Sequence, residues 1–259
     1  MKGEEFILSH KDEKKVFTQK TEEEKSKSYK LWNIASKIVP HQGNNWNEFF
    51  SLFLKRQSLS RILYYNEVYQ HIINVPGSIL ELGVQWGSTL STLINLRGMY
   101  EPYNSSRVVY GFDTFSGFPA IDEKDGTLAA IGDYEVIDNY DIVLEDVLKT
   151  IESFSPLNHI KKFDLIKGNV VDTLPIFLKE NPHLIISMII FDMDIYEPTK
   201  KSLEIITDRL TKGSVLVFDE LHCKHFPGET LALKEALGIN KLRLIRNPHQ
   251  TYCSYAIWE

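Results

Sequence analysis

Apolar and polar residues follow two different rhythms along this chain. From residue 28 to residue 74 the apolar positions recur at helical spacing, and no strand signal precedes residue 75. The clearest helical stripe consists of Leu59, Ile62, Leu63, Asn66, Val68, Ile72 and Ile73. Beyond residue 75, short apolar runs alternate with helical segments. The runs at 78–84, 107–113, 161–169, 184–194 and 214–220 predict strands, and 241–247 and 251–259 predict two more.

Predicted helices lie between most of these strands, at 88–97, 140–154, 171–180, 198–210 and 229–237, the fourth ended by Gly213. This order predicts an α/β fold: a doubly wound, Rossmann-like, mostly parallel sheet of seven strands. The nearly continuous apolar run at 184–191 suits a strand covered on both faces. Only a short link, Pro248-His249-Gln250, joins the last two strands, so the final strand should run antiparallel. We expect residues 1–74 to form an N-terminal helical extension or lid and 75–259 an α/β domain.

Composition narrows the possible partners. The net charge is −6 and the pI about 5.8, which disfavours binding to nucleic acid. No apolar run is long enough to span a bilayer, and the charged N-terminus does not resemble a signal peptide. Two cysteines, Cys223 and Cys253, favour a reducing compartment. We therefore expect a cytoplasmic protein without membrane partners, and a homo-oligomer remains open.

A glycine-rich junction follows the first predicted strand. Glu81, Gly83 and Gly87 precede Ser88 and Thr89 at the start of a helix. In open α/β sheets, ligands bind beyond the carboxyl ends of the strands, and helix amides there suit an anionic group. The spacing G-x-x-x-G differs from the dinucleotide fingerprint, and no lysine completes a P-loop. E-L-G-x-x-x-G-S instead resembles the first motif of class I S-adenosylmethionine-dependent methyltransferases.

Two further segments fit the same ligand. Asp113 and Thr114 follow the second strand, where a carboxylate can accept both hydroxyls of a ribose. Asp113 as a helix cap is the simpler alternative. Asn169 and Val170 follow the third strand, where methyltransferases of this class hold the adenine ring.

Four acids stand at the ends of the next two strands: Asp192 and Asp194 at one, Asp219 and Glu220 at the other. Parallel strand ends share one edge, so these carboxylates should converge there. Clustered acids suit a hard divalent ion such as Mg²⁺, which can orient neighbouring sugar hydroxyls. Either a carboxylate or His222 would then take the proton. Helix caps and solvated loop acids are the alternative. His222, Cys223 and His225 permit zinc, which the surplus of acids disfavours.

These motifs together resemble the macrocin O-methyltransferase (TylF/MycF-type) family. The resemblance extends from about residue 61 to the C-terminus and rests on VPGSILELGVQWGST, GFDTFSGFP, GNVVDTLP, FDMDIYEPTKKSLE, GSVLVFDE and PGETLALKEALG. It implies a Mg²⁺-dependent methyl transfer from S-adenosylmethionine to a hydroxyl of a deoxysugar, often nucleotide-linked or attached to a natural product.

The same resemblance implies roles for individual residues. The cofactor would contact Glu81, Gly83, Gly87, Ser88, Thr89, Asp113, Thr114, Asn169, Val170 and Asp192. The metal would bind Asp192, Asp219 and Glu220, with Asp192 or Asp194 as the base. The family commonly has Asp-Asp where this chain has Asp219-Glu220. The longer glutamate would shift or remove one metal ligand, so a metal-independent mechanism stays open.

Several alternatives remain at this point. A class I methyltransferase for a catechol-like or other small-molecule acceptor fits the same acids, and so does a non-catalytic adenosine-ligand-binding protein on the same fold. Arg61, Tyr64 and Tyr65 either line an acceptor site or serve ordinary packing. Lys224, Arg243 and Arg246 either pair with a diphosphate or are solvated charges.

Overall fold

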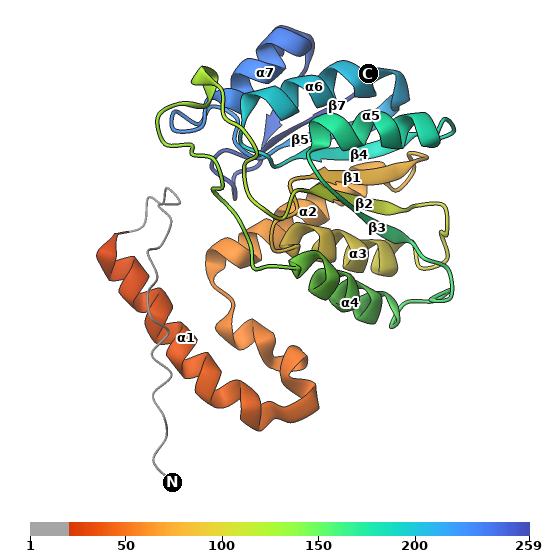
Figure 1. Ribbon diagram of the computed structural model, residues 1–259. Coiled ribbons are helices and arrows are strands. Elements are labelled where there is room, and N and C mark those ends of the chain that lie inside the picture. Colours follow the sequence, from red (N-terminus) through yellow and green to blue (C-terminus); the bar gives the residue numbers. More distant parts are fainter. Residues whose placement is uncertain (1–20) are drawn as a thin grey trace. The chain divides into compact units, whose positions relative to one another are not determined.

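The computed structural model describes residues 21–259 of the chain (Figure 1). Its contacts divide the chain into two units, residues 1–49 and 50–259. In the first unit, helix α1 (Glu22–Gln42) begins with a capping box between Thr21 and Glu24 and contains no buried residue. The 3-10 helix η1 (Gly43–Phe53) follows. None of the described helices combines the length and the apolarity needed to cross a membrane.

The second unit is built on a sheet of seven strands in the order β3-β2-β1-β4-β5-β7-β6. These are β1 (Ser78–Leu82), β2 (Val109–Asp113), β3 (Phe163–Lys167), β4 (Ile186–Phe191), β5 (Leu210–Phe218), β6 (Leu244–Arg246) and β7 (Ser254–Ile257). Neighbours among β1 to β5 pair in parallel, whereas β7 is antiparallel to both β5 and β6. The predicted doubly wound sheet with a reversed final strand is therefore confirmed.

Helices cover both faces of this sheet (Figure 1). On one face α2 (Arg56–Ile72), α3 (Ser88–Tyr100) and α4 (Tyr140–Glu152) bury apolar side chains such as Tyr64, Leu93 and Leu148. On the other, α5 (Val170–Glu180), α6 (Tyr196–Ile206) and α7 (Gly228–Ala236) bury residues such as Leu174 and Leu203. Because β1 and β4 are adjacent while β2 lies on the other side of β1, the chain reverses its winding there. That reversal creates a crevice at the carboxyl ends of β1 and β4.

Helix α2 packs closely within the second unit. Tyr64, Tyr65 and Ile72 are fully buried. The buried guanidinium of Arg107 donates to the carbonyl oxygens of Ile72 (2.9 Å) and Gly77 (2.8 Å), which fixes the end of α2 beside β1. The predicted boundary at residue 74, and a lid function for residues 1–74, stay predictions, and residues 1–20 lie outside the described part.

Several predicted boundaries differ from the structure. The helix expected at 198–210 ends at Ile206, and the short helix η3 (Thr207–Arg209) leads into β5. Gly213 does not end a helix: it lies inside β5 with φ +92°, and a Cβ there would press on the side chain of Val75. Near the C-terminus, η4 (Ile239–Lys241) shortens the expected strand at 241–247 to the three residues of β6.

Candidate active site

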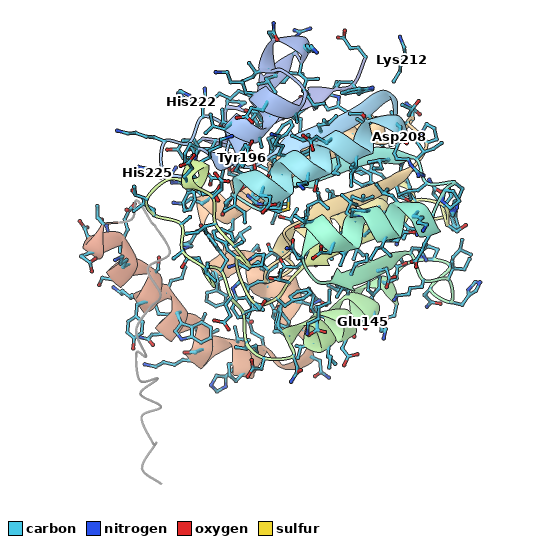
Figure 2. All side chains as sticks on the ribbon, turned by 45° about the horizontal axis from the view of Figure 1, so that its top comes forward. Glu145, Tyr196, Asp208, Lys212, His222 and His225 are labelled. Carbon is cyan, nitrogen blue, oxygen red and sulfur yellow. The ribbon has the colours of Figure 1, made fainter. Side chains whose placement is uncertain are left out.

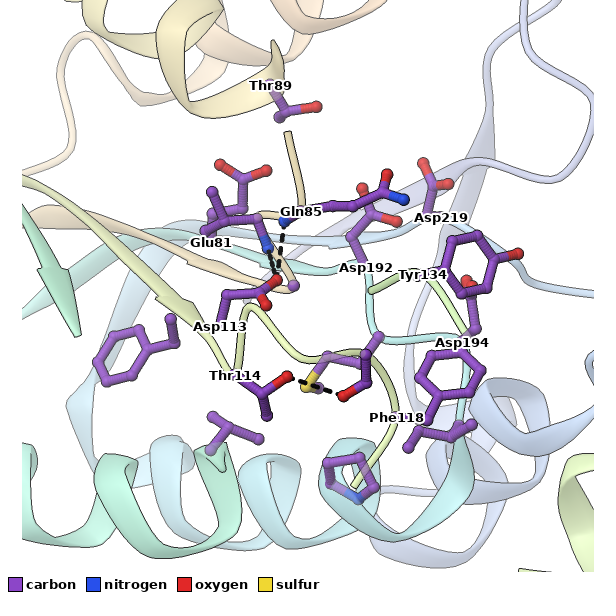
Figure 3. Close-up of a pocket in the computed structure, with 18 of the residues that line it drawn as sticks. Glu81, Gln85, Thr89, Asp113, Thr114, Phe118, Tyr134, Asp192, Asp194 and Asp219 are labelled. Atoms are coloured by element: carbon purple, nitrogen blue, oxygen red, sulfur yellow. Dashed lines mark hydrogen bonds between the residues drawn. The ribbon is translucent and has the colours of Figure 1, made fainter. Parts of the chain in front are cut away.

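A cavity of about 410 Å³ opens at the carboxyl ends of β1 and β4 (Figure 3). It lies entirely within residues 50–259, and its size is typical of a small-molecule site. The structure brings most of the predicted site residues to its wall: Glu81, Gly83, Ser88, Thr89, Asp113, Thr114, Asn169, Val170, Asp192, Asp194, Asp219 and Glu220. Two predicted residues, Gly87 and His222, do not line it.

Contacts within the protein already require glycine at two positions of the glycine-rich junction. Gly83 has φ +96°, and a Cβ there would collide with the backbone carbonyl of Asp192. Gly87 is the N-cap of α3 with φ +76°, and its missing Cβ leaves room for the side chain of Leu144. The close approach of Gly83 to Asp192 joins the end of β1 to the end of β4, and so sets the depth of the cavity.

Asp113 organises the loops on the β1–β2 side. One carboxylate oxygen accepts from the backbone N–H groups of Val84 and Gln85, both at 2.7 Å, and the other accepts from Phe115 N at 2.5 Å (Figure 3). A carboxylate has about four acceptor positions, so only the second oxygen keeps one free. Asp113 therefore keeps one acceptor position free, and its binding to the two ribose hydroxyls stays a prediction.

Other predicted cofactor residues also have partners within the chain. The Thr114 hydroxyl donates to the Gly117 carbonyl at 2.8 Å, and the Asn169 side chain caps α5 by accepting from Val171 N. The Thr89 hydroxyl accepts from Arg61 at 3.2 Å. These hydrogen bonds fix the side chains in the cavity wall. A ligand would contact the backbone of these residues and the side-chain atoms that have no partner.

Glu81 is a deeply buried, unsatisfied group of the cavity. Its side chain, on β1, is 1% exposed and lines the wall, and its Oε2 atom has no hydrogen-bond partner. Burial, with Asp192 nearby, raises the pKa of the Glu81 carboxyl well above its usual value. A buried polar atom without a partner is costly, so this position is prepared for a hydrogen-bonding ligand.

The predicted acidic cluster does form, but an arginine lies within it. Arg61, from α2, donates to Asp192 Oδ2 at 2.7 Å and to Asp219 Oδ1 at 2.8 Å. Burial and the nearby Asp219 nevertheless raise the pKa of Asp192 well above its usual value. In the described chain, no three side chains of His, Cys, Asp or Glu are arranged to hold a metal ion. The carboxylates as folded therefore do not fit the Mg²⁺ ion that the resemblance implies.

Asp194 occupies a separate corner of the cavity with Tyr134. Tyr134 lies beside Asp194 in the cavity wall (Figure 3), and both residues adopt positive φ angles, +61° for Asp194 and +64° for Tyr134. Burial and the nearby Glu220 raise the pKa of Asp194 to about 8. Such strained backbone is usually retained where the surrounding structure requires a side chain in one place.

The remaining candidates lie elsewhere. His222 is exposed, His225 is partly exposed, and Figure 2 shows both at the same end of the domain as Tyr196. Cys223 is buried, and the described residues form no zinc-binding group with it. Lys224, Arg243 and Arg246 do not line the cavity.

Sequence reasoning missed part of the wall. No site residue was predicted between positions 115 and 139, yet Gly117, Phe118, Pro119 and Tyr134 from this segment line the cavity. The 3-10 helix η2 (Glu123–Asp125) anchors this segment, because Asp125 accepts from Tyr196 N at 2.5 Å. The motif GFDTFSGFP signalled the start of the segment, but nothing local marked Tyr134.

Comparison with known proteins agrees with the family resemblance drawn from the sequence motifs. A family model described as macrocin-O-methyltransferase (TylF) matches residues 3–240. The crystal structure of CalS11, a calicheamicin methyltransferase, is 35% identical with a TM-score of 0.87, covering 95% of this chain and 97% of that one.

Two further solved structures extend the comparison. The apo structure of CalS11, described as a TDP-rhamnose 3'-O-methyltransferase of calicheamicin biosynthesis, is 33% identical (TM-score 0.80) and covers 95% of this chain and 99% of that one. The O-methyltransferase NovP shares the fold at 20% identity, with a TM-score of 0.55 and coverage of 76% and 79%. No curated protein sequence matches this chain.

Proposed function

Since this chain belongs to the macrocin O-methyltransferase family, we propose that it transfers a methyl group from S-adenosylmethionine to a hydroxyl of a deoxysugar. The acceptor would carry a nucleotide or form part of a natural product. One observation carries the proposal: a buried, partnerless glutamate and an ordered carboxylate share a cavity with a separate group of acids. The first pair suits a cofactor, and the second group suits a hydroxyl acceptor.

The β1–β2 side of the cavity supports the cofactor. Glu81 Oε2 lacks a partner inside the protein, and the ammonium group of a methionine moiety is a donor that would satisfy it. Asp113 keeps one free acceptor position for a ribose hydroxyl. The first N–H groups of α3 have no carbonyl partners within the helix and suit a carboxylate. When bound, S-adenosylmethionine supplies an electrophilic methyl group on its sulfonium.

The chain's own part in the transfer is to align the acceptor hydroxyl, exclude water and take its proton. As the new carbon–oxygen bond forms and the carbon–sulfur bond breaks, the hydroxyl proton needs a nearby base. We assign that proton to Asp194. Asp192 is less suitable because Arg61 holds its Oδ2, and His222 lies outside the cavity wall. Tyr134 lies beside Asp194 in the cavity wall (Figure 3).

The proposed class of acceptor is inferred from what similar proteins are described as methylating. The similar CalS11 enzyme is described as acting on TDP-rhamnose, and the segment 115–139 and α2 contribute walls beside the acids where a sugar would lie. The Mg²⁺ ion of the family resemblance stays a prediction. Its carboxylates bond to Arg61 here, so no step of the transfer is assigned to it. A cytoplasmic location and a homo-oligomer likewise stay predictions.

A panel of acceptors tests this function. Purified protein is incubated with S-adenosylmethionine and either a TDP-6-deoxysugar, a catechol or buffer, and methylated product is identified by mass spectrometry. We expect methylation of the deoxysugar alone, abolished in the matched variant Asp194→Asn. Methylation of the catechol instead would show that the acceptor is a catechol-like compound and not a deoxysugar. Cofactor binding without turnover of any acceptor would favour a non-catalytic role.

A further inference from the structure

Arg61 is the most heavily engaged side chain in the cavity. Besides its ion pairs with Asp192 and Asp219, its Nε and Nη2 atoms donate to the Thr89 hydroxyl at 3.3 and 3.2 Å, and Nη2 reaches the Tyr65 hydroxyl at 3.3 Å. Its guanidinium also lies 5.2 Å from the centre of the Tyr65 ring. One planar cation thus connects α2, α3, β4 and β5 (Arg56–Ile72, Ser88–Tyr100, Ile186–Phe191 and Leu210–Phe218).

This position overlaps the place where a divalent ion would bind. Two of the three residues implied as metal ligands, Asp192 and Asp219, direct carboxylate oxygens at the guanidinium. Asp219 Oδ1 also receives a weak bond from Cys253 Sγ at 3.0 Å. The third, Glu220, is held through its backbone N–H, which donates to Glu229 at 3.1 Å, and its Oε2 atom has no partner.

A guanidinium and a divalent ion cannot share these oxygens. Two positive charges a few ångströms apart repel strongly in a site that is largely removed from water. The side chains of Arg61, Asp192 and Asp219 are only 30%, 22% and 14% exposed, so solvent screens them weakly. Arginine keeps its charge at all ordinary pH values. A metal ion can bind the pair only when Arg61 has moved away.

We propose that Arg61 is a built-in counter-ion that competes with divalent cations for Asp192 and Asp219, and so lowers the metal affinity of this family member. The proposal does not rest on the proposed methyl transfer. It concerns the ion pairs of the protein without cofactor or acceptor, and it can fail while the methyltransferase function stands.

Binding of Mn²⁺ to the full chain, followed by calorimetry and by the EPR signal of the free ion, tests the competition. Arg61→Gln should bind Mn²⁺ at least about tenfold more tightly than the wild type, because it loses the charge and both ion pairs. Arg61→Lys keeps a charge but cannot bridge two carboxylates, so its gain should be smaller. Lys161→Gln removes a surface cation paired with Asp164 and should bind Mn²⁺ as the wild type does.

The double variant Arg61→Gln/Asp219→Asn locates the effect. The gained Mn²⁺ affinity should disappear in it, because one of the two released carboxylates is gone. The proposal is overturned if folded Arg61→Gln binds Mn²⁺ no more tightly than the wild type, or if the gain survives Asp219→Asn. Circular dichroism and thermal melting establish that each variant is folded. If Arg61→Gln does not fold, an Mn²⁺ affinity of Arg61→Lys equal to that of the wild type overturns the proposal as well.

Discussion

The two halves of the cavity hold their carboxylates in different ways. On the β1–β2 side, Asp113 is satisfied by three backbone N–H groups contributed by the loops after β1 and β2. On the β4–β5 side, Asp192 and Asp219 depend on one side chain, Arg61, which comes from a distant helix. The first arrangement is fixed by the main chain. The second depends on a group that can move or be exchanged.

This difference indicates that one half of the cavity binds the cofactor and the other binds the acceptor. Backbone donors are kept in every substitution except one to proline, so the β1–β2 half gives a binding surface that suits a cofactor common to many enzymes. Side-chain partners can vary between relatives and between ligand states, which suits the half that meets the acceptor. The strained residues Asp194 and Tyr134 also border the second half. We therefore expect substitutions on the β4–β5 side to affect turnover, and those on the β1–β2 side to affect cofactor affinity and stability.

The largest effect is expected from Asp194→Asn. Asparagine tolerates the positive φ of +61° as well as aspartate does, so the backbone should be retained. Loss of the base should lower kcat by about 10² to 10⁴-fold, with little change in cofactor affinity. Steady-state kinetics with a TDP-deoxysugar measures this. His222→Asn is the control, and the assignment is wrong if that variant loses turnover while Asp194→Asn keeps it.

The next effect concerns the junction between the halves. Gly83→Ala forces a Cβ toward the backbone carbonyl of Asp192 at φ +96° and should cost about 3 kcal/mol of unfolding free energy. Gly87→Ala also has a positive φ, but its Cβ meets only the flexible side chain of Leu144, so the cost should be about 1 kcal/mol. Urea unfolding of both variants measures the difference. Equal losses would contradict the close approach of β1 and β4.

The smallest effect is a gain of stability in Glu81→Gln. Glutamine avoids ionisation of a carboxyl whose pKa burial raises, so the melting temperature should rise by roughly 2–4 °C at neutral pH. Below about pH 4.3 the wild-type carboxyl is neutral in both the folded and the unfolded state, and the gain should vanish. Above that pH only the unfolded state ionises freely, so wild-type stability falls and the gain grows. Glu204→Gln, on the exposed face of α6, controls for charge removal, and a gain independent of pH would contradict the account.

Local sequence patterns were sufficient for most of the fold. Strands β1 and β4 (Ser78–Leu82 and Ile186–Phe191) and the second half of β5 (residues 214–218) are mainly apolar and fully buried, and the short link before β7 predicted its reversal. Glycine marked the start of a helix correctly at Gly87, which is the N-cap of α3. The same reasoning failed at Gly213, because its need for glycine arises from contact with Val75, a residue far away in sequence.

Residues of the candidate site could be predicted only where they stand at the end of a strand. Asp113, Asp192 and Asp219 follow their strands directly, so their convergence could be expected. The role of Arg61 could not, because it depends on how α2 packs across the sheet and on partners more than a hundred residues away. Tyr134 was missed for a similar reason: its ring packs against Phe118 and Phe226, and no local spacing encodes these contacts.

The central claim is that the cavity binds the cofactor on its β1–β2 side and the acceptor on its β4–β5 side. Calorimetric titration with S-adenosylhomocysteine tests this claim most directly. The wild type should bind one equivalent. Glu81→Gln should weaken binding by about tenfold, because it removes a carboxyl that can ionise when the ligand's ammonium group binds beside it. Asp194→Asn should bind nearly as the wild type does. No binding to the wild type, or equal weakening by both substitutions, would contradict the account.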